Sequence, residues 1–420
     1  MYTANVNISK LITVILWSIL LLLPDISSAQ ETRKGSTSNW EDFDIKIRVL
    51  MRLCHFPSAS ICLIKGETIF YSKTYGFSNF YKRKRASKET IYMVGSISKS
   101  IIATALMQLY EKGYFDLDDN VADYLPFDLR NPFFPNTNIT FRMLLSHEAS
   151  INDFGLRPST VLPIRVSAKH ARNYSDIVEN MVEPGGRWYS SRYWLKRYRP
   201  GDTACYSNLG MIIAGCLLEE LSGMSVEEYC RKYIFEPLDM RHTTFDMQRL
   251  DRKKLAQPYT SVGKLFIPLP KYDFYLLDPA GGLYTTAEDL SHFLIAHMNG
   301  GVYNETRILN ESTVRLMHTV QYPESTDLIL GKMFAGKIEL HHGLGWMKIN
   351  FLGQELEGHS GGTIGYNCHM LCFTREDGEK VGFVMLTNAP LLQPAFFSPV
   401  RTLLSYTLIL KAIVKELNEL

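Results

Sequence analysis

One stretch decides the fold: residues 96–113 read Ser-Ile-Ser-Lys-Ser-Ile-Ile-Ala-Thr-Ala-Leu-Met-Gln-Leu-Tyr-Glu-Lys-Gly. Apolar side chains recur there at three- and four-residue intervals, which predicts a helix from Ser96 to Lys112 with Gly113 as its stop. Residues three apart share a helix face, so Lys99 can approach the hydroxyl of Ser96.

Ser96 and Lys99 are the first candidates for catalysis. A serine hydroxyl is a poor nucleophile unless a neighbouring base takes its proton, and a desolvated lysine with a lowered pKa can do so. The helix N-terminus would add a positive dipole and unpaired N–H groups beside the serine. The alternative is that Ser96 is an ordinary helix N-cap. The same spacing occurs at Ser261 and Lys264, in a predicted loop with no helix to align the two side chains.

The second candidate is Tyr206-Ser207-Asn208, which stands before a predicted apolar helix. A tyrosine close to a lysine ammonium can have its pKa lowered and then shuttle a proton. Asn208 could offer its amide to a substrate carbonyl, or it could hold Lys99 in place. The alternative is a surface tyrosine and a helix-capping asparagine.

The third candidate is Gly-His-Ser-Gly-Gly at residues 358–362. Its G-x-S-x-G pattern could be a nucleophile elbow with Ser360 attacking, but an elbow needs a following helix and then an acid before a histidine. A strand is predicted to follow instead, and the only later histidine, His369, precedes Asp377. The elbow is therefore rejected.

We interpret residues 358–362 as an edge strand that lines a cleft, with His359 facing the substrate. Because a glycine lets another backbone approach closely, Gly361 and Gly362 could offer an N–H group to an oxyanion. The alternative for His359 is a hydrogen-bonded structural histidine.

Strand-like segments occur early and late in the chain, with mostly helical sequence between them. The expected strands are 60–64, 68–75, 346–351, 363–374 and 381–386, and the further expected helices are 40–53, 208–221 and 395–420. This order predicts an α+β fold with an antiparallel five-stranded sheet flanked by N- and C-terminal helices. The predicted sheet domain is split into residues 38–115 and 335–420, and a mainly helical subdomain at 116–334 is inserted between them.

The composition is that of a globular protein, with 46% hydrophobic and 21% charged residues among 420 and a formal net charge of +2. These values exclude a disordered chain, a fibrous protein and a multi-span membrane protein. A charge of +2 over this length attracts phosphate weakly, so no nucleic-acid partner is expected. The basic run Lys82-Arg83-Lys84-Arg85 is interpreted as a solvated hairpin loop.

The N-terminal residues have the pattern of a secretory signal peptide. Lys10 precedes an uncharged, mostly apolar run from Leu11 to Leu23, and small residues at 27–29 offer a cleavage site. We therefore predict a signal peptide at residues 1–29 and a secreted or exported protein. The alternative is an uncleaved N-terminal anchor, which would be the only expected contact with a membrane.

Export would permit glycosylation at four N-x-S/T triplets, which begin at Asn138, Asn173, Asn304 and Asn310. Seven cysteines without a CxxC pattern give no support for a zinc site, and no metal or other cofactor is expected. Cys54 and Cys62 could pair in an oxidising compartment.

In their order along the chain, these motifs resemble those of the serine β-lactamase and penicillin-binding-protein superfamily, and of its β-lactamase-related hydrolases in particular. Besides the three candidate segments, the similar stretches are Leu144–His147, Pro279–Leu283 with Asp289, and Gly343–Trp346. The resemblance runs from about Phe43 to Leu410, most of the chain after the predicted signal peptide. It implies a β-lactamase/transpeptidase-like fold in which the sheet domain and the inserted subdomain form one catalytic unit.

The resemblance also implies roles for the residues that do the chemistry. Ser96 would be the acylated nucleophile, and Lys99 with Tyr206 would handle its proton. The backbone N–H groups of Ser96 and Gly362 would form the oxyanion hole. The implied reaction is acyl transfer through a covalent Ser96 acyl-enzyme that water releases.

Substrate contacts are implied for Asn208, His359 and Ser360. The third motif of the β-lactamases usually starts with lysine, whereas here it starts with His359, which is similar to the D,D-peptidases, esterases and mitochondrial relatives of the superfamily. A neutral imidazole would hold a substrate carboxylate less firmly than an ammonium. We therefore expect a small-molecule or peptide substrate that is cleaved at a peptide or ester bond.

Two alternatives to this serine hydrolase stay open. The first is a true β-lactamase or D,D-carboxypeptidase. The second is a catalytically silent binding or assembly module of the same fold, and the joint presence of Ser96, Lys99, Tyr206 and His359 counts against it. The sequence leaves the oligomeric state open.

Overall fold

The computed structural model describes residues 40–153, 174–262, 265–273, 278–329, 340–351, 353–389 and 399–419. The predicted signal peptide at 1–29, the triplet at Asn173 and Lys264 lie outside the described residues. The chain divides into two compact units, of which the larger runs from His55 to Leu391 and the smaller takes the residues on either side of it.

The smaller unit contains α2 (Trp40–Cys54) and α13 (Pro399–Asn418), which pack against each other. Apolar residues on each helix are buried, among them Ile47 and Ile413, as amphipathic spacing requires. Both predicted terminal helices are thereby confirmed, the C-terminal one from Pro399 onward.

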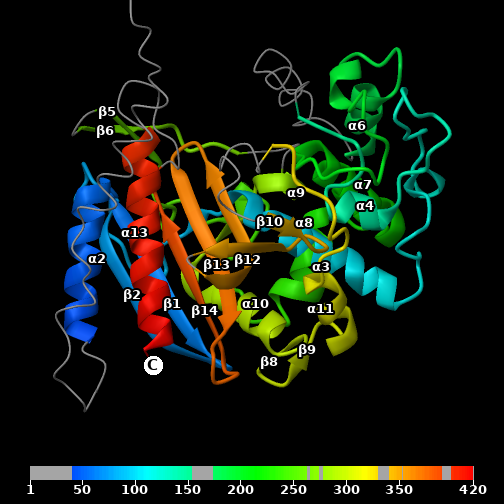
Figure 1. Cartoon of the computed structure of the whole chain (residues 1–420). Coiled ribbons are helices and arrows are strands. Elements are labelled where there is room, and N and C mark those ends of the chain that lie inside the picture. Colours follow the sequence, from blue (N-terminus) through cyan, green and yellow to red (C-terminus); the bar gives the residue numbers. More distant parts are fainter. Residues whose placement is uncertain are drawn as a thin grey trace, which may run out of the picture. The chain divides into compact units, whose positions relative to one another are not determined.

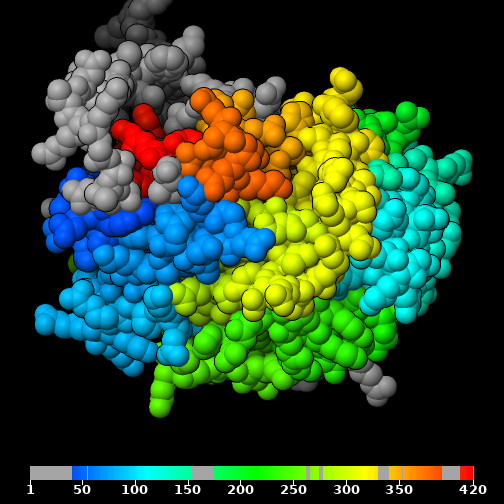
Figure 2. Space-filling model, turned by 90° about the horizontal axis from the view of Figure 1, so that it is seen from below, coloured from blue at the N-terminus to red at the C-terminus, as the bar shows by residue number. Residues whose placement is uncertain are grey.

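Among the described residues, the larger unit is built around an eight-stranded sheet in which all neighbouring strands are antiparallel (Figure 1). In sheet order the strands are β10 (Leu340–His342), β11 (Met347–Phe351), β12 (Gln354–Thr363), β13 (Tyr366–Thr374), β14 (Lys380–Thr387), β1 (Ser58–Lys65), β2 (Thr68–Asn79) and β3 (Lys84–Arg85). Because β1 pairs with β14, early and late parts of the chain meet in one sheet. Figure 2 shows these segments side by side, in blue and orange.

The α+β fold class and the antiparallel sheet are confirmed, but the predicted number of five strands is wrong. The five expected strands do not include β3 and β10, which have two and three residues, or β12. The edge strand interpreted at residues 358–362 is the later part of β12, and its glycines, which are depleted in strands, weaken the strand signature there. The predicted strand 363–374 is in fact interrupted by a turn at Ile364 and Gly365, and the other four predicted strands are confirmed as β1, β2, β11 and β14.

Helices α3 (Ser98–Glu111) and α7 (Asn208–Ser222) pack against each other in the larger unit and confirm two predicted helices. Every residue of α3 from Ser98 to Leu109 is buried, as expected of a helix surrounded by core. The other α-helices described are α4 (Phe141–Leu145), α6 (Ser175–Val182), α8 (Val226–Cys230), α9 (Asp278–Gly281), α10 (Ala287–Met298) and α11 (Glu311–His318). Figure 1 shows α4, α6 and α7 to one side of the sheet, and α10 packs against β1, β2, β13 and β14.

Short elements complete the larger unit. Pairs of short strands are β4 (Tyr92–Met93) with β7 (Tyr284–Thr285), β5 (Tyr259–Val262) with β6 (Leu265–Pro268), and β8 (Val302–Tyr303) with β9 (Thr306–Arg307). The 3-10 turns are η2 (Gly95–Ile97), η3 (Val121–Tyr124), η4 (Ser191–Tyr193) and η6 (Met247–Arg249), and η5 (Arg231–Phe235) is a π-helical turn. The segment around Ser261, predicted as a loop, is therefore the β5–β6 hairpin instead.

Several sequence features are located by the structure without being tested by it. Asn138, Asn304 and Asn310 are exposed, and their glycosylation stays a prediction, as do the predicted boundaries of the split domain. Cys62 is a free, buried thiol on β1, so its suggested pairing with Cys54 is wrong.

Within the described ranges, no single helix has both the length and the hydropathy to cross a bilayer, and only the bent pair Asn208–Ser222 with Val226–Phe235 meets these criteria jointly.

Gly358 gives a test of the close approach between β12 and β13. Its φ is 145°, and a Cβ there would lie 2.1 Å from the carbonyl oxygen of Met370. We expect Gly358→Ala to lower the free energy of unfolding by at least about 3 kcal/mol, because a steric collision adds to backbone strain. Gly378→Ala is the matched control: its φ is 85° and no atom lies within 4 Å of a Cβ, so we expect a loss of about 1 kcal/mol. Urea denaturation followed by circular dichroism measures the free energy of unfolding of both variants. Equal losses of stability would contradict the close contact between β12 and β13 at Gly358.

Candidate active site

Ser96 lies in η2, directly before α3, and its side chain is half-buried. The N-cap position of α3 is occupied by Ile97, which has no side-chain cap. The Ser96 hydroxyl oxygen instead accepts a hydrogen bond from Nζ of Lys99 at 2.9 Å. Ser96 is therefore not an ordinary helix cap, and its hydroxyl faces the amine of Lys99, which could take its proton.

Lys99 is fully buried. Its Nζ donates to Ser96 Oγ, to Asn208 Oδ1 at 2.8 Å and to the carbonyl oxygen of Ala280 at 2.5 Å, so all three donors of an ammonium are satisfied. Burial lowers the pKa of Lys99 to about 7, against the opposing attraction of Asp153. An appreciable fraction of the side chain is therefore the neutral amine near pH 7, the form that can accept a proton.

Tyr206 lies beside Lys99, with Nζ 4.9 Å from the centre of its ring. The expected lowering of the pKa of Tyr206 is not found. Burial raises the pKa well above its ordinary value and outweighs the opposing hydrogen bond with Ser96. The phenol therefore keeps its proton at neutral pH, and of these two side chains only Lys99 titrates in that range.

Asn208 is the first residue of α7, but it is not the cap of this helix. Ser207 is the N-cap, and its hydroxyl oxygen accepts from the backbone N–H of Gly210 at 3.1 Å. The side-chain oxygen of Asn208 accepts from Lys99, and its Nδ2 donates to Asp153 at 2.7 Å. Both ends of the amide are thus engaged by the protein, which matches the predicted alternative of holding Lys99.

Asp153 is a site residue that the sequence reasoning missed. Its carboxylate accepts from Ser207 Oγ at 3.0 Å and from the backbone N–H groups of Asn208 at 2.9 Å and Leu209 at 3.1 Å. These bonds fix the start of α7 and place a negative charge near Lys99. Asp153 lies in an irregular segment 55 residues before Asn208, so no local pattern marks it.

The strand β12 brings the third motif against η2. β11 pairs with β12 only as far as Gly358, whereas β13 pairs with it along its whole later part. A Cβ on Gly361 would lie 1.9 Å from the carbonyl oxygen of Val94 and 2.8 Å from the backbone nitrogen of Ser96. Only glycine permits this approach, and it brings the nitrogen of Gly362 to 3.1 Å from where a Cβ of Gly95 would stand.

The side chains of His359 and Ser360 lie on opposite faces of β12. Successive side chains of a strand point to opposite faces. The ring of His359 lies 6.3 Å from that of Tyr206, centre to centre, and its Nδ1 is 2.7 Å from its neighbour's carbonyl oxygen. The hydroxyl of Ser360 bonds with Nδ1 of His369 at 2.8 Å. The structure therefore groups His359 with Ser96, Lys99, Tyr206 and Asn208, and it does not bring Ser360 to them.

The imidazole of His359 is neutral at pH 7. Burial, with the nearby charge of Lys99, lowers its pKa to about 3. A neutral ring adds no positive charge to the surroundings of Lys99, so His359 can take part in hydrogen bonding but not in ion pairing.

A second group missed by the sequence supports Tyr206. The ring of His147 lies 4.5 Å from that of Tyr206 and 5.0 Å from that of His342. Asp327 accepts from His342 Nε2 at 2.9 Å and from the backbone N–H of Tyr206 at 3.0 Å. Burial holds the pKa of His147 well below its ordinary value, so Tyr206 packs against an uncharged ring. Asp327 and His342 are remote from Tyr206 in sequence, and only the fold reveals them.

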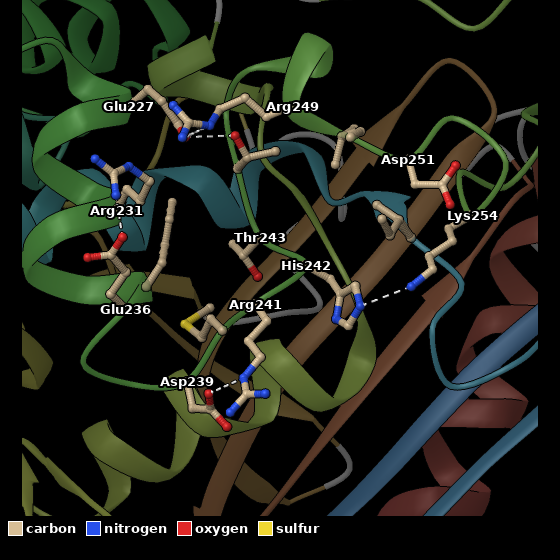
Figure 3. Close-up of a pocket in the computed structure, with 15 residues that line it drawn as sticks. Glu227, Arg231, Glu236, Asp239, Arg241, His242, Thr243, Arg249, Asp251 and Lys254 are labelled. Atoms are coloured by element: carbon tan, nitrogen blue, oxygen red, sulfur yellow. Dashed lines mark hydrogen bonds and ion pairs between the residues drawn. The ribbon is translucent and has the colours of Figure 1, made fainter.

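A cavity of about 560 Å³ lies away from this cluster, and none of the candidate residues lines it. Figure 3 shows its charged side chains turned toward one another: Arg241 pairs with Asp239 at 2.5 Å, and Arg231 pairs with Glu236. These two cations are paired with carboxylates of the same cavity. The cavity shares no residue with the Ser96 cluster and adds no group to it. Within the described ranges, no group of three or more His, Cys, Asp or Glu side chains is arranged to hold a metal ion.

The fold, with serine and lysine one helical turn apart, places the chain in the class of serine β-lactamase-like proteins. The model of the family "Beta-lactamase" matches residues 43–402. The chain therefore belongs to the beta-lactamase family, and the predicted membership of the serine β-lactamase and penicillin-binding-protein superfamily is confirmed.

Known relatives and solved structures agree with this assignment. Protein flp of Staphylococcus aureus (strain MW2) is 26% identical over 246 residues, which are 58% of this chain and 46% of that protein, so the chain spans about half the length of this relative. The octameric penicillin-binding protein homologue of Pyrococcus abyssi has a TM-score of 0.68 at 25% identity, over 90% of this chain and 77% of that one. The D-amino acid amidase of Ochrobactrum anthropi has a TM-score of 0.64 at 20% identity, over 89% and 99%.

Titration of Lys99 tests the electrostatics of the site without assuming an activity. In protein with ¹³C-labelled lysine, we expect one side-chain signal, absent from Lys99→Met, to titrate near pH 7. Asp153→Asn should lower this midpoint, because the carboxylate charge raises the pKa of Lys99. Asp128→Asn, at a half-exposed carboxylate that pairs with Arg130, is the control and should leave the midpoint unchanged. A Lys99 signal that titrates only above about pH 10 would contradict the lowering of its pKa by burial.

Proposed function

We propose that this protein is a serine hydrolase that acts by acyl transfer through a covalent acyl-enzyme on Ser96. One observation carries the proposal: the Ser96 hydroxyl lies 2.9 Å from the amine of a fully buried lysine whose pKa is about 7. A serine paired with a base that is half-deprotonated at neutral pH is an activated nucleophile. Membership of the beta-lactamase family supports the same chemistry.

The first half of the reaction forms the acyl-enzyme. Neutral Lys99 takes the hydroxyl proton of Ser96 while Oγ bonds to the substrate carbonyl carbon, and the carbonyl electron pair moves onto oxygen. Backbone N–H groups of Ser96 and Gly362 would stabilise that oxyanion. Collapse of the intermediate breaks the bond to the leaving alcohol or amine, which receives a proton from the Lys99 ammonium, directly or through the phenol of Tyr206.

The second half of the reaction releases the acyl group. Lys99, neutral again, takes a proton from water as the water oxygen attacks the ester carbon on Ser96. Collapse expels the serine oxygen, which recovers its proton from Lys99, and the carboxylic acid leaves. Asn208 keeps Lys99 in place through both halves, because its amide oxygen accepts from Nζ and Asp153 holds its nitrogen.

Peptide or ester bonds are the proposed target. The imidazole of His359 is uncharged at pH 7, so it gives no ammonium to hold a substrate carboxylate. A substrate without a required carboxylate therefore fits this site better than a penicillin does. We also propose, from the pattern of residues 1–29, that the hydrolase is exported.

An active-site probe tests the nucleophile. We expect a fluorophosphonate to label the protein on Ser96, and Ser96→Ala to lose the label, because only this hydroxyl has Lys99 as a neighbouring base. Ser360→Ala is the matched control: it removes the serine of the G-x-S-x-G pattern, which bonds with His369, and should keep the label. Peptide mapping by mass spectrometry identifies the labelled residue. Label on Ser360, or none on the wild type, would contradict the proposal, and the latter result would favour a silent binding module.

A second candidate function is that of a true β-lactamase or D,D-carboxypeptidase, which the similarity to a penicillin-binding protein homologue favours. The rate on the β-lactam nitrocefin, compared with rates on p-nitrophenyl esters and peptides, tests the β-lactamase, and a preference for D-amino-acid peptides over p-nitrophenyl esters and L-amino-acid peptides would indicate the D,D-carboxypeptidase. We expect ester or peptide turnover at least about tenfold faster than nitrocefin turnover, since a neutral His359 replaces a cation. His359→Lys should raise relative activity on nitrocefin. Fast hydrolysis of nitrocefin by the wild type would favour the second candidate.

A further inference from the structure

A patch of exposed apolar and basic side chains lies at the tips of two neighbouring hairpins. It consists of residues 80–85, which form the β2–β3 turn and β3, and of residues 265–268, which form β6, and we name it the basic-aromatic surface. Leu265 is 64% exposed, Tyr81 58%, Phe80 39% and Ile267 38%. Side chains of this size rarely cluster in water without a binding role.

The two hairpins are tied together, so the exposed side chains are held in place. The hydroxyl of Tyr81 donates to the carbonyl oxygen of Phe266 at 2.5 Å, and the backbone N–H of Phe80 donates to the Tyr259 hydroxyl at 2.9 Å. The rings of Phe80 and Phe266 meet edge to face, with centres 4.9 Å apart. These contacts tie the β2–β3 turn to β5 and β6.

Positive charge surrounds the apolar side chains. Lys82, Arg83, Lys84 and Arg85 are all exposed. In the part of the chain that the structure describes, none of these four side chains takes part in an ion pair, although Arg85 lies over the ring of Phe77.

The positive field of this region is concentrated. Lys84 donates to the backbone carbonyl of Lys253, and Lys271 donates to that of Arg252 at 2.9 Å. Burial lowers the pKa of Lys271, and the charges of Lys84, Lys82 and Arg252 lower it further against the opposing charge of Asp251. The whole chain has a formal net charge of only +2, so the excess of cations in this region is not a property of the chain as a whole.

The basic-aromatic surface adjoins the strand that carries the third motif. After β12, Ile364 is 68% exposed, and its carbonyl oxygen accepts from the Tyr272 hydroxyl at 2.8 Å. A Cβ on Gly365 would lie 3.1 Å from the backbone nitrogen of Tyr259, the first residue of β5. The turn after β12 therefore packs against the start of the hairpin that contributes β6.

We propose that the basic-aromatic surface docks on a lipid bilayer that carries anionic headgroups. Apolar side chains that enter the interface, next to lysines and arginines that meet anionic headgroups, are the features of interfacial membrane binding. A soluble polyanion would meet the cations but leave Leu265, Ile267 and Tyr81 in water. Docking departs from the expectation that an N-terminal anchor is the only membrane contact, and it does not depend on the proposed hydrolase activity.

Vesicle co-sedimentation of the full chain tests the docking. We expect binding to phosphatidylcholine vesicles with about 30% phosphatidylglycerol to be at least about tenfold tighter than to phosphatidylcholine alone, and to weaken as salt rises from about 50 to about 500 mM. The double variants Leu265→Ser with Ile267→Ser and Lys82→Ser with Arg83→Ser should each weaken it at least about tenfold. The wild type and all variants carry the same N-terminal residues, so any vesicle binding by residues 11–23 contributes equally to each of them.

Matched variants elsewhere serve as controls. Tyr114→Ser removes a side chain that is 50% exposed, and Arg192→Ser with Arg197→Ser removes two exposed cations; both should bind as the wild type does. Circular dichroism verifies that each variant is folded.

Three outcomes would overturn the docking proposal. They are no preference for anionic vesicles, unchanged vesicle binding by both double variants, or weakened vesicle binding only in Lys82→Ser with Arg83→Ser. The last would mark a site for a soluble polyanion, which binding to heparin would then detect. Turnover of a soluble ester should be unaffected in the surface variants, so a failure of the proposed hydrolase activity would be distinguishable from a failure to dock.

Discussion

The burial of Lys99 is the constraint on which the site depends. Its pKa falls from 10.5 to about 7, and each unit is worth about 1.4 kcal/mol, so burial costs on the order of 5 kcal/mol of stability near and below pH 7. The unfolded chain binds the proton more tightly, so this loss is recovered as the pH rises from 7 toward 10.5. The buried length of α3 offsets the cost, because almost every residue of that helix lies in the core.

The three acceptors around Lys99 explain why distant segments are arranged as they are. Ser96 comes from the turn before α3, Asn208 from the start of α7 and the carbonyl of Ala280 from α9. Two of these segments are fixed by a further contact: Asp153 binds the start of α7, and β12 lies against the turn with Ser96. Burial lowers the pKa of the lysine amine to about 7, while the three acceptors satisfy the three donors of its ammonium form, so that the charged form is left with no unpaired donor.

The parts of the fold and site that the sequence predicts are those encoded by local spacing. Helical periodicity places α3 and α7, and the three-residue spacing of Ser96 and Lys99 on one helix makes their contact a local property. Asp153 and Asp327 act on residues remote in sequence, so their roles follow only from the folded chain. The pKa of Tyr206 was expected to fall because a cation is near, and it rises because burial, which no motif encodes, is the larger effect. Only residues 358–362 of β12 are interpreted as a strand, and the predicted strand count omits it, because the glycines that let it approach Ser96 also weaken the strand signature.

Glycines in and after β12 give this part of the chain two neighbours. At Gly361 the strand contacts the turn of Ser96, and two residues after Thr363 it contacts the hairpin of β5 and β6. A rigid strand that is paired along one edge with β13 transmits little relative motion between its ends. The catalytic edge and the basic-aromatic surface are therefore held at a fixed separation, and a bilayer in contact with the surface would always meet the active site from the same side.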